Sequence, residues 1–170
     1  LGNLENILEG KFRPGHFQGV CRVMDRLMNI TLPDILYLGQ KDYQQVMVIR
    51  RLLDSIGNEA ELVVVPTIRE ESGLAMSSRN QRLTDEEKLR AASIYRELMW
   101  IKETQLNASF SVLKERAIEN LKENGIETEY LELCDANDLT IIEDFISAKK
   151  MVVLIAVYIS GIRLIDNLIL

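Results

Sequence analysis

The sequence has few of the features from which disulfide frameworks, zinc sites and membrane spans are built. Its 170 residues include two cysteines, Cys21 and Cys134, which lie far apart and in no C-x-x-C spacing. This argues against a disulfide scaffold and a metal site, and we expect two ordinary buried thiols in a reducing cytoplasm. The longest apolar run, Met151–Ile159, is too short to span a membrane and predicts a buried strand.

Basic residues are also fewer than acidic ones. Lysine and arginine total 20 against 26 acidic residues, a net charge of −6, which argues against nucleic acid as the main partner. There is one histidine, His16, at a predicted helix start; without an identifiable partner it favours a structural role over acid–base catalysis. The chain opens with Leu1 and lacks the regions of a signal peptide, and we interpret it as a chain entered partway through.

The first part of the chain is predicted to form a βαβ unit. Apolar residues recur at helical spacing in 17–28 and again in 43–56, where Gly57 ends the pattern. Two short apolar runs, Ile35–Leu38 and 61–66, predict parallel strands covered on both faces and joined by the second helix. We expect this α/β segment to occupy residues 1–67.

The remainder, residues 68–170, predicts a small α+β domain. Thr84 and Glu87 form a possible capping box for a helix that runs to about Gln105. A second helix is predicted over 109–124, and Ser160-Gly161 suggests a hairpin turn. The three strands predicted for its antiparallel sheet are 129–134, 151–158 and 162–167.

Two polar segments are candidates for a binding site. Gly39-Gln40-Lys41-Asp42 follows a predicted parallel strand, at the sheet edge where such folds bind ligands, and Gln45 lies one turn into the next helix. A surface Lys–Asp pair is the alternative interpretation. In Met76-Ser77-Ser78-Arg79-Asn80, hydroxyls and a guanidinium suit phosphate oxygens, and a solvated loop is the alternative.

Several long motifs resemble those of one enzyme family. Residues 8–17, 39–45, 73–80 and 163–167 closely resemble the pantoate–β-alanine ligases, the pantothenate synthetases, in order and at the family's spacing. The resemblance implies a ligase of coenzyme A precursor biosynthesis. ATP and pantoate give pantoyl adenylate and pyrophosphate, and β-alanine then gives pantothenate and AMP. It also implies Mg²⁺ with the nucleotide, a cytoplasmic location and a homodimer.

Site residues follow from the resemblance by position. The ATP-binding residues it implies are Gly39, Gln40, Lys41, Asp42, Ile68, Met76, Ser77, Ser78 and Arg79. Gln45 is implied to hydrogen-bond pantoate, and Lys41 and Arg79 to stabilise the charge that develops on the phosphate.

The sequence also departs from the family. The resemblance implies an N-terminal portion with a HIGH-type motif that is missing, and His16 does not match that motif. The resemblance implies that residues 1–67 are the C-terminal part of a Rossmann-like domain that binds ATP and pantoate, and that residues 68–170 are a lid. We therefore expect the chain alone to be inactive or nearly so. Two alternatives remain open: a non-catalytic ATP-binding module, and a structural or interaction fragment.

Overall fold

The computed structural model describes residues 1–146 and 149–170. The chain forms two compact units, Leu1–Pro66 and Thr67–Leu170. Among the described residues, none of the helices combines the length and the apolar character that crossing a bilayer requires.

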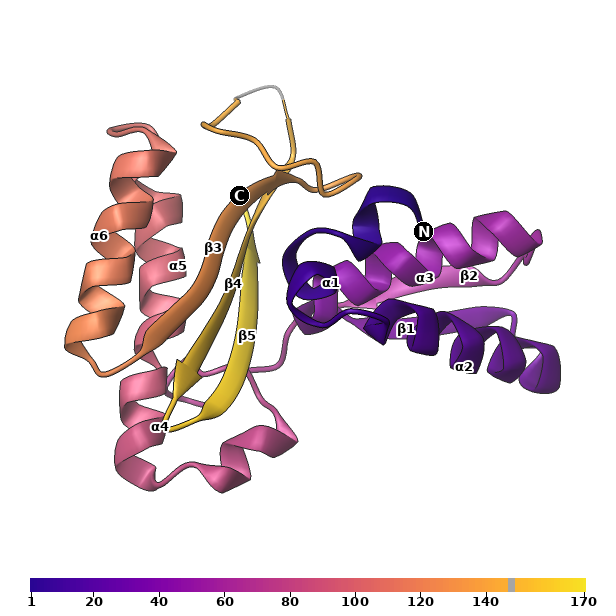
Figure 1. The fold of residues 1–170 in the computed structure, drawn as a ribbon, viewed down its shortest axis with the longest axis horizontal. Helices are drawn as coiled ribbons and strands as arrows, with labels where there is room; N and C mark the ends of the chain where they lie inside the picture. The colour runs from indigo at the N-terminus through magenta and orange to yellow at the C-terminus, as the bar shows by residue number, and fades with distance from the viewer. Residues whose placement is uncertain (147–148) are drawn as a thin grey trace. The chain divides into compact units, whose positions relative to one another are not determined.

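The first unit is built around two parallel strands (Figure 1). Strand β1 (Ile35–Gly39) pairs in register with β2 (Glu61–Val65), and α3 (Tyr43–Ile56) connects them. Gly57 ends α3 in the left-handed conformation, at φ 63°, as its position in the sequence predicts. The predicted βαβ unit is therefore confirmed. The elements before and within it are η1 (Gly2–Glu5), α1 (Leu8–Phe12), α2 (His16–Thr31) and the 3₁₀ turn η2 (Gln40–Asp42).

Among the described residues, helices cover one face of this small sheet, and for this chain the prediction of strands buried on both faces is wrong. Met28 of α2 and Ile49 and Leu53 of α3 pack together against Leu36, Leu38 and Leu62. Both helices therefore lie on the same face. Because successive side chains of a strand alternate between faces, Ile35 and Tyr37 point away from the helices, and they are 42% and 62% exposed.

The second unit is an antiparallel sheet with two helices against one face (Figure 1). The sheet has the order β3-β4-β5, and a tight turn at Ser160 and Gly161, both at positive φ, joins β4 to β5. The predicted hairpin and the predicted fold class are confirmed. The elements are η3 (Ser78–Arg82), α4 (Asp85–Ala91), α5 (Ser93–Thr104), α6 (Phe110–Glu123), β3 (Glu127–Asp135), β4 (Met151–Ile159) and β5 (Ile162–Ile169).

The helix predicted from Thr84 to about Gln105 is two helices, which corrects the sequence interpretation. The capping box is present: the Thr84 hydroxyl accepts from the Glu87 N–H, and the Glu87 carboxylate accepts from the Thr84 N–H. The break falls at Ala92, between α4 and α5. There the Ser93 hydroxyl donates to the Arg90 carbonyl at 2.7 Å, a side-chain bond that competes with the helical pattern and bends helices.

The core of the second unit lies between helices and sheet. Leu98 and Ile101 of α5, with Leu121 of α6, are fully buried against side chains from all three strands, including Ile155 of β4. Strand β4 is buried along almost its whole length, as its apolar run predicts. Burial of this continuous apolar layer is what holds α5 and α6 against the sheet.

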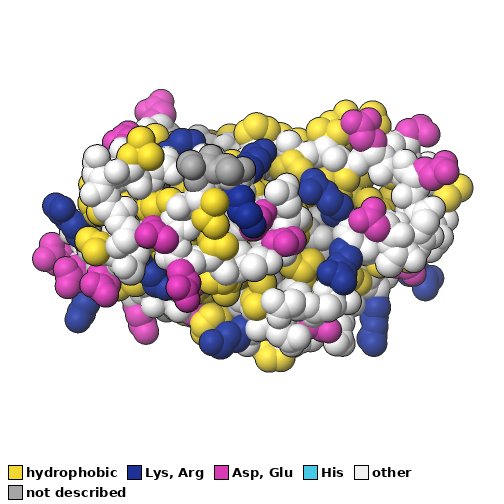
Figure 2. Space-filling model, turned by 90° about the horizontal axis from the view of Figure 1, so that it is seen from above, with side chains coloured by type: hydrophobic (Ala, Val, Ile, Leu, Met, Phe, Trp, Pro, Cys, Tyr) yellow, Lys and Arg dark blue, Asp and Glu magenta, His cyan; other side chains and the backbone are white. Residues whose placement is uncertain are grey.

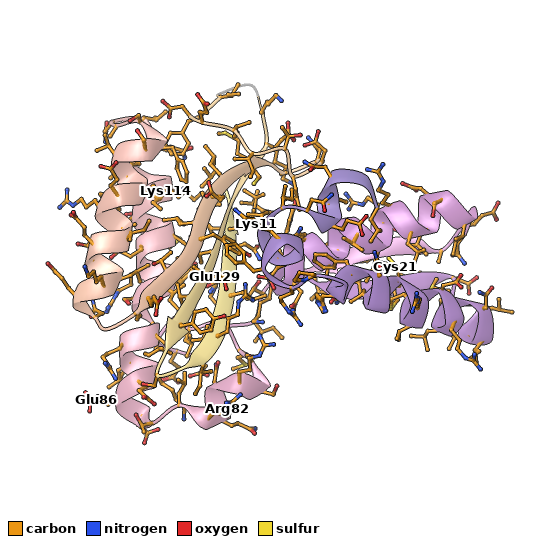
Figure 3. All side chains as sticks on the ribbon, in the orientation of Figure 1. Lys11, Cys21, Arg82, Glu86, Lys114 and Glu129 are labelled. Atoms are coloured by element: carbon orange, nitrogen blue, oxygen red, sulfur yellow. The ribbon has the colours of Figure 1, made fainter. Side chains whose placement is uncertain are left out.

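The two cysteines differ in burial, so the prediction of two buried thiols is half wrong. Cys134 of β3 is fully buried, whereas Cys21 on α2 is half-buried (Figure 3). Cys21 stands one position beyond Val20, which packs against the core of the first unit. A step of one residue turns about 100° around a helix, and this moves the Cys21 thiol to the flank.

Thiol reactivity is expected to follow this difference. Burial, with the charges of Glu132 and Asp138, raises the pKa of the Cys134 thiol to about 12, and burial also raises the pKa of the Cys21 thiol. The thiolate is the reactive form, so iodoacetamide at about pH 8 should label Cys21 slowly, and faster as the pH rises. Cys134 should be labelled only after unfolding. Peptide mass spectrometry reads both sites, with Cys21→Ser as the control. Equal labelling of both sites in the folded chain would contradict the expectation.

Candidate functional site

The first candidate segment follows β1 directly. Gly39 pairs with Val65, so the carboxyl ends of both parallel strands lie at one edge of the sheet, and η2 begins there. The Lys41 side chain is 17% exposed, and its Nζ lies 3.8 Å from Oδ2 of the half-exposed Asp42. The structure therefore places Gly39, Gln40, Lys41 and Asp42 at the edge that the sequence predicts, with a partly covered cation among them.

Gln45 lines a cavity in the first unit. The cavity is a wide-open hollow of about 660 Å³ between the first turns of α3 and the start of α2, and Val23 in its wall is 66% exposed. Its walls are largely apolar, with the Gln45 amide and the His16 imidazole as the polar side chains. The residues that line it are Pro14, Gly15, His16, Gly19, Val20, Val23, Met24 and Gln45. Such a hollow suits a small molecule with an apolar body and a few polar groups.

Sequence reasoning found Gln45 but not its surroundings. The sequence predicted a structural role for His16, whereas the structure places it in the cavity wall, with its ring 5.1 Å from that of Phe17. The neighbouring Gln44 is buried: its amide donates to the carbonyls of Leu4 and Ile7, at 2.8 and 3.0 Å. Gln44 thereby ties the start of the chain to the helix that carries Gln45. Nothing in the sequence around Gln44 indicates that its amide bonds the start of the chain.

The second candidate segment lies in the second unit and connects an extended strand-like stretch to η3. Ser77 is extended, at φ −156° and ψ 146°, and its hydroxyl oxygen accepts from the Arg79 N–H at 3.2 Å. Ser78 is exposed, and Arg79 is half-buried. The local backbone thus presents two hydroxyls and a guanidinium within three consecutive residues, a set of donors that suits phosphate oxygens.

Two exposed apolar side chains flank this polar segment. The Met76 N–H donates to the Ile68 carbonyl at 2.9 Å, and Arg69 pairs with Ala75 in an antiparallel bridge. Residues directly opposite in an antiparallel pair share a face, so Ile68 and Met76 lie side by side. They are 67% and 51% exposed, which leaves an apolar surface next to the hydroxyls of the segment.

Asn80 fixes the far end of the segment, and sequence reasoning gave it no role. It is 4% exposed, and its Nδ2 donates to Oε1 of Glu70 at 2.7 Å and to the Ala75 carbonyl at 3.1 Å. Glu70 is therefore partly a structural acceptor rather than only a solvated acid. The only hint of this role in the sequence was that Asn80 directly follows Arg79.

On the face drawn in Figure 2, basic and acidic side chains of the described residues are interspersed with apolar ones, and no field of one sign covers that face. Within residues 1–146 and 149–170, no group of three His, Cys, Asp or Glu side chains is placed to hold a metal ion. Among the described residues, three polar sets that suit a ligand are the cavity with Gln45, the Gly39–Asp42 edge and the 76–79 segment.

Comparison with known proteins places the chain in one family. The model of the family described as pantoate-beta-alanine ligase matches residues 1–169. The pantothenate synthetase of Cytophaga hutchinsonii is 44% identical over 176 residues, covering 100% of this chain and 61% of the relative. That of Neisseria meningitidis serogroup C is 44% identical over 168 residues, covering 98% of this chain and 60% of the relative. The chain thus spans about three fifths of the length of these curated relatives.

Solved structures agree with the sequence matches. The pantothenate synthetase of Thermus thermophilus superposes with a TM-score of 0.90 at 37% identity, covering 99% of this chain and 61% of that one. A pantoate-beta-alanine ligase from Francisella tularensis, solved in complex with beta-gamma ATP and beta-alanine, gives a TM-score of 0.75 at 34% identity, covering 98% of this chain and 55% of that one. With its family model matched over all but its last residue, the chain belongs to the pantoate-beta-alanine ligase family.

Proposed function

We propose that the chain supplies part of the site of an ATP-dependent ligase that joins pantoate to β-alanine and makes pantothenate. The family match over residues 1–169 carries this proposal. A second support is that the related Francisella tularensis ligase was solved with beta-gamma ATP and beta-alanine. The cavity beside Gln45, apolar with a few polar groups, has the character that a small branched hydroxy acid needs.

The proposed reaction has two steps. The pantoate carboxylate attacks the α-phosphorus of ATP, a P–O bond forms, and pyrophosphate leaves with the electron pair of the broken bond. The β-alanine amine then attacks the acyl carbon of pantoyl adenylate, the amide bond forms, AMP leaves, and the amine gives up a proton. Both steps gain mainly from orientation of the reactants and from charge stabilisation, so the protein needs no nucleophile of its own.

The side chains divide these tasks. Gln45 would hydrogen-bond pantoate inside the cavity, where its amide offers both a donor and an acceptor. Ile68 would lie against the adenosine, with Met76 beside it, since the two form an exposed apolar surface. Gly39, Gln40 and Asp42 would border the nucleotide from the first unit.

The phosphates would be held by Ser77, Ser78, Arg79 and Lys41. Hydroxyls donate to phosphate oxygens along defined directions, and the guanidinium adds two parallel donors. Lys41 and Arg79 would stabilise the negative charge that grows as the phosphorus is attacked. The convergence of Lys41 with Ser77–Arg79 on one nucleotide is part of the proposal.

Mg²⁺ is proposed to enter with ATP. The described residues contain no cluster of three ligating side chains, and Mg²⁺ at nucleotide sites is commonly held by phosphates and water with one or two carboxylates. It would neutralise phosphate charge there. A homodimer in the cytoplasm is proposed for the intact enzyme on the family resemblance.

Replacing Arg79 by alanine should weaken ATP binding. Loss of a bidentate charged donor to phosphate is expected to lower the affinity of the chain for ATP by about tenfold to a hundredfold, at 1.4 kcal/mol per factor of ten. Isothermal titration calorimetry of the 170-residue chain measures this. Arg82→Ala is the matched control, because Arg82 is an exposed arginine of the same short helix (Figure 3). If Arg79→Ala and the unchanged chain bind ATP equally, the assignment of this segment to phosphate is wrong.

Ligase activity is tested by making pantothenate. We propose that the reaction needs the part of the relatives that this chain does not span. The chain alone should then form little or no pantothenate from ATP, pantoate and β-alanine. The chain joined to the remaining part of the Cytophaga hutchinsonii enzyme should form it. ATP binding by the joined protein without product would instead favour a nucleotide-binding module without ligase chemistry.

A further inference from the structure

Arg69 makes the most extensive set of side-chain contacts in the loop that precedes the 76–79 segment. Its Nη1 and Nη2 donate to Oδ2 and Oδ1 of Asp166, at 2.6 and 2.9 Å, in a bidentate pair. Nη1 also donates to the Gly73 carbonyl at 3.1 Å. The Arg69 and Asp166 side chains are 17% and 4% exposed, so this ion pair is shielded from water. One guanidinium therefore joins the loop to strand β5.

An aromatic ring completes the binding site of this guanidinium, which we call its seat: Asp166, the Gly73 carbonyl and Tyr95. The Arg69 Cζ lies 3.7 Å from the centroid of the Tyr95 ring, which α5 carries. A planar guanidinium can stack on a ring and keep its fork of donors in one plane, and an ammonium cannot do both. The position of Arg69 is thus fixed from the sheet and from a helix of the same unit.

Gly73 shows how closely the loop is fitted to this seat. It has a φ of +91°, and a Cβ at this position would lie 2.8 Å from Cδ1 of Tyr95. The Gly73 N–H donates to the Glu70 carbonyl, and the Glu70 N–H donates to the Leu74 carbonyl. The turn between Ile68 and Met76 is therefore held by its own backbone and by the Arg69 side chain.

The 76–79 segment therefore lies between two anchoring side chains, the half-buried Arg69 and the buried Asn80. Before the segment, Arg69 bonds the Gly73 carbonyl. After the segment, the Asn80 amide bonds the Glu70 carboxylate and the Ala75 carbonyl. The intervening Met76 and Ser78 are exposed and gain little from burial. Their arrangement depends on the two anchoring side chains, together with the bonds from the Met76 N–H to the Ile68 carbonyl and from the Arg79 N–H to the Ser77 hydroxyl.

We propose that Arg69 is a positioning residue. It acts through the backbone of the Gly73–Arg79 segment, which it holds in the arrangement that presents Ser77, Ser78 and Arg79 together. That the segment binds the phosphates of ATP rests on the proposed function; that Arg69 orders the segment does not. Preorganised donors bind without the cost of ordering them, so losing the anchor should weaken binding.

Site-resolved hydrogen exchange tests the anchor without any ligand. Arg69→Lys keeps the charge but loses the fork and the stacking. Amide exchange at Met76 and Asn80, whose N–H groups donate to Ile68 and Ser77, should rise by about tenfold or more through local opening, while exchange in α6 stays unchanged. ATP affinity should fall by a similar factor. A purely structural role would instead raise exchange throughout the second unit.

A matched control and a second variant separate the outcomes. Lys114→Met breaks another ion pair of the same unit, between α6 and β3, where Lys114 Nζ lies 2.9 Å from Glu132 Oε1 (Figure 3); it should leave exchange at Met76 and Asn80 unchanged. Tyr95→Leu removes the ring without unpairing a charge and should raise exchange at the same two amides, in case Arg69→Lys does not fold.

Each result decides one of the two proposals. Unchanged exchange at Met76 and Asn80 in folded Arg69→Lys, or a uniform rise across the second unit, overturns the positioning role. If the unchanged chain fails to bind ATP while exchange at these amides still rises selectively, the phosphate assignment fails and the positioning role stands. Faster exchange with undiminished ATP affinity overturns the link between the anchor and binding.

Discussion

Replacing Leu98 by alanine should destabilise the second unit by about 2–5 kcal/mol, the range for removing a buried leucine side chain from a close-packed core. Leu98 lies on α5 with no exposed surface, in the layer that joins α5 and α6 to the sheet. Truncation removes its apolar contacts and leaves a cavity that neighbouring helices and strands cannot close without moving. The large effect follows from this cavity rather than from helix propensity, since alanine is the better helix former.

The chain offers a probe that reports on this unit alone. Trp100 is the single tryptophan, and it packs against the core of the second unit, with the Arg116 guanidinium 5.1 Å from its ring centroid. Urea unfolding followed by Trp100 fluorescence should show a lower midpoint for Leu98→Ala at an unchanged slope. Leu89→Ala is the matched control, because Leu89 lies on α4 and is 67% exposed. Equal midpoints for the two variants would show that the core does not depend on Leu98.

Local sequence patterns predicted the elements of this fold well. Helical spacing and Gly57 placed α3, and the Thr84–Glu87 pair marked the start of α4. Both signals act within a few residues, where backbone hydrogen bonding is decided. The break at Ala92 was not predicted, because Ser93, whose hydroxyl bonds the Arg90 carbonyl there, is a residue that helices also tolerate. The exposure of one face of β1 was not predicted, because the apolar content of a strand does not reveal on which side the helices lie.

The residues of the candidate site also differ in how far the sequence could predict them. Ser77, Ser78 and Arg79 are contiguous, so their chemistry was visible in the sequence, and Gln45 was placed by its offset from a strand end. The anchor was not visible, because Arg69 and Asp166 are separated by 97 positions and only the tertiary fold brings them together. Family resemblance supplied the names of the substrates but no role for this ion pair.

Removing the partner of Arg69 should be as damaging as removing a core leucine. In Asp166→Ala, the Arg69 guanidinium keeps its shielded seat beside Tyr95 without the carboxylate that neutralises it. Breaking a buried pair by removing one partner costs about 3–5 kcal/mol, because a desolvated charge is left uncompensated. Trp100 fluorescence in urea measures the loss. Asp85→Ala is the control: the Asp85 side chain is 99% exposed in its pair with Lys88, and its loss should change stability by about 1 kcal/mol or less.

A double variant then separates stability from positioning. Arg69→Met with Asp166→Leu replaces both charges by apolar side chains, and such replacements of buried pairs are often neutral or stabilising. The urea midpoint for unfolding of the second unit should therefore return close to that of the unchanged chain. Exchange at Met76 and Asn80 should nevertheless stay fast, because no donor reaches the Gly73 carbonyl. Recovery of stability and slow exchange together would mean that packing alone orders the segment, and that the charge of Arg69 has no part in it.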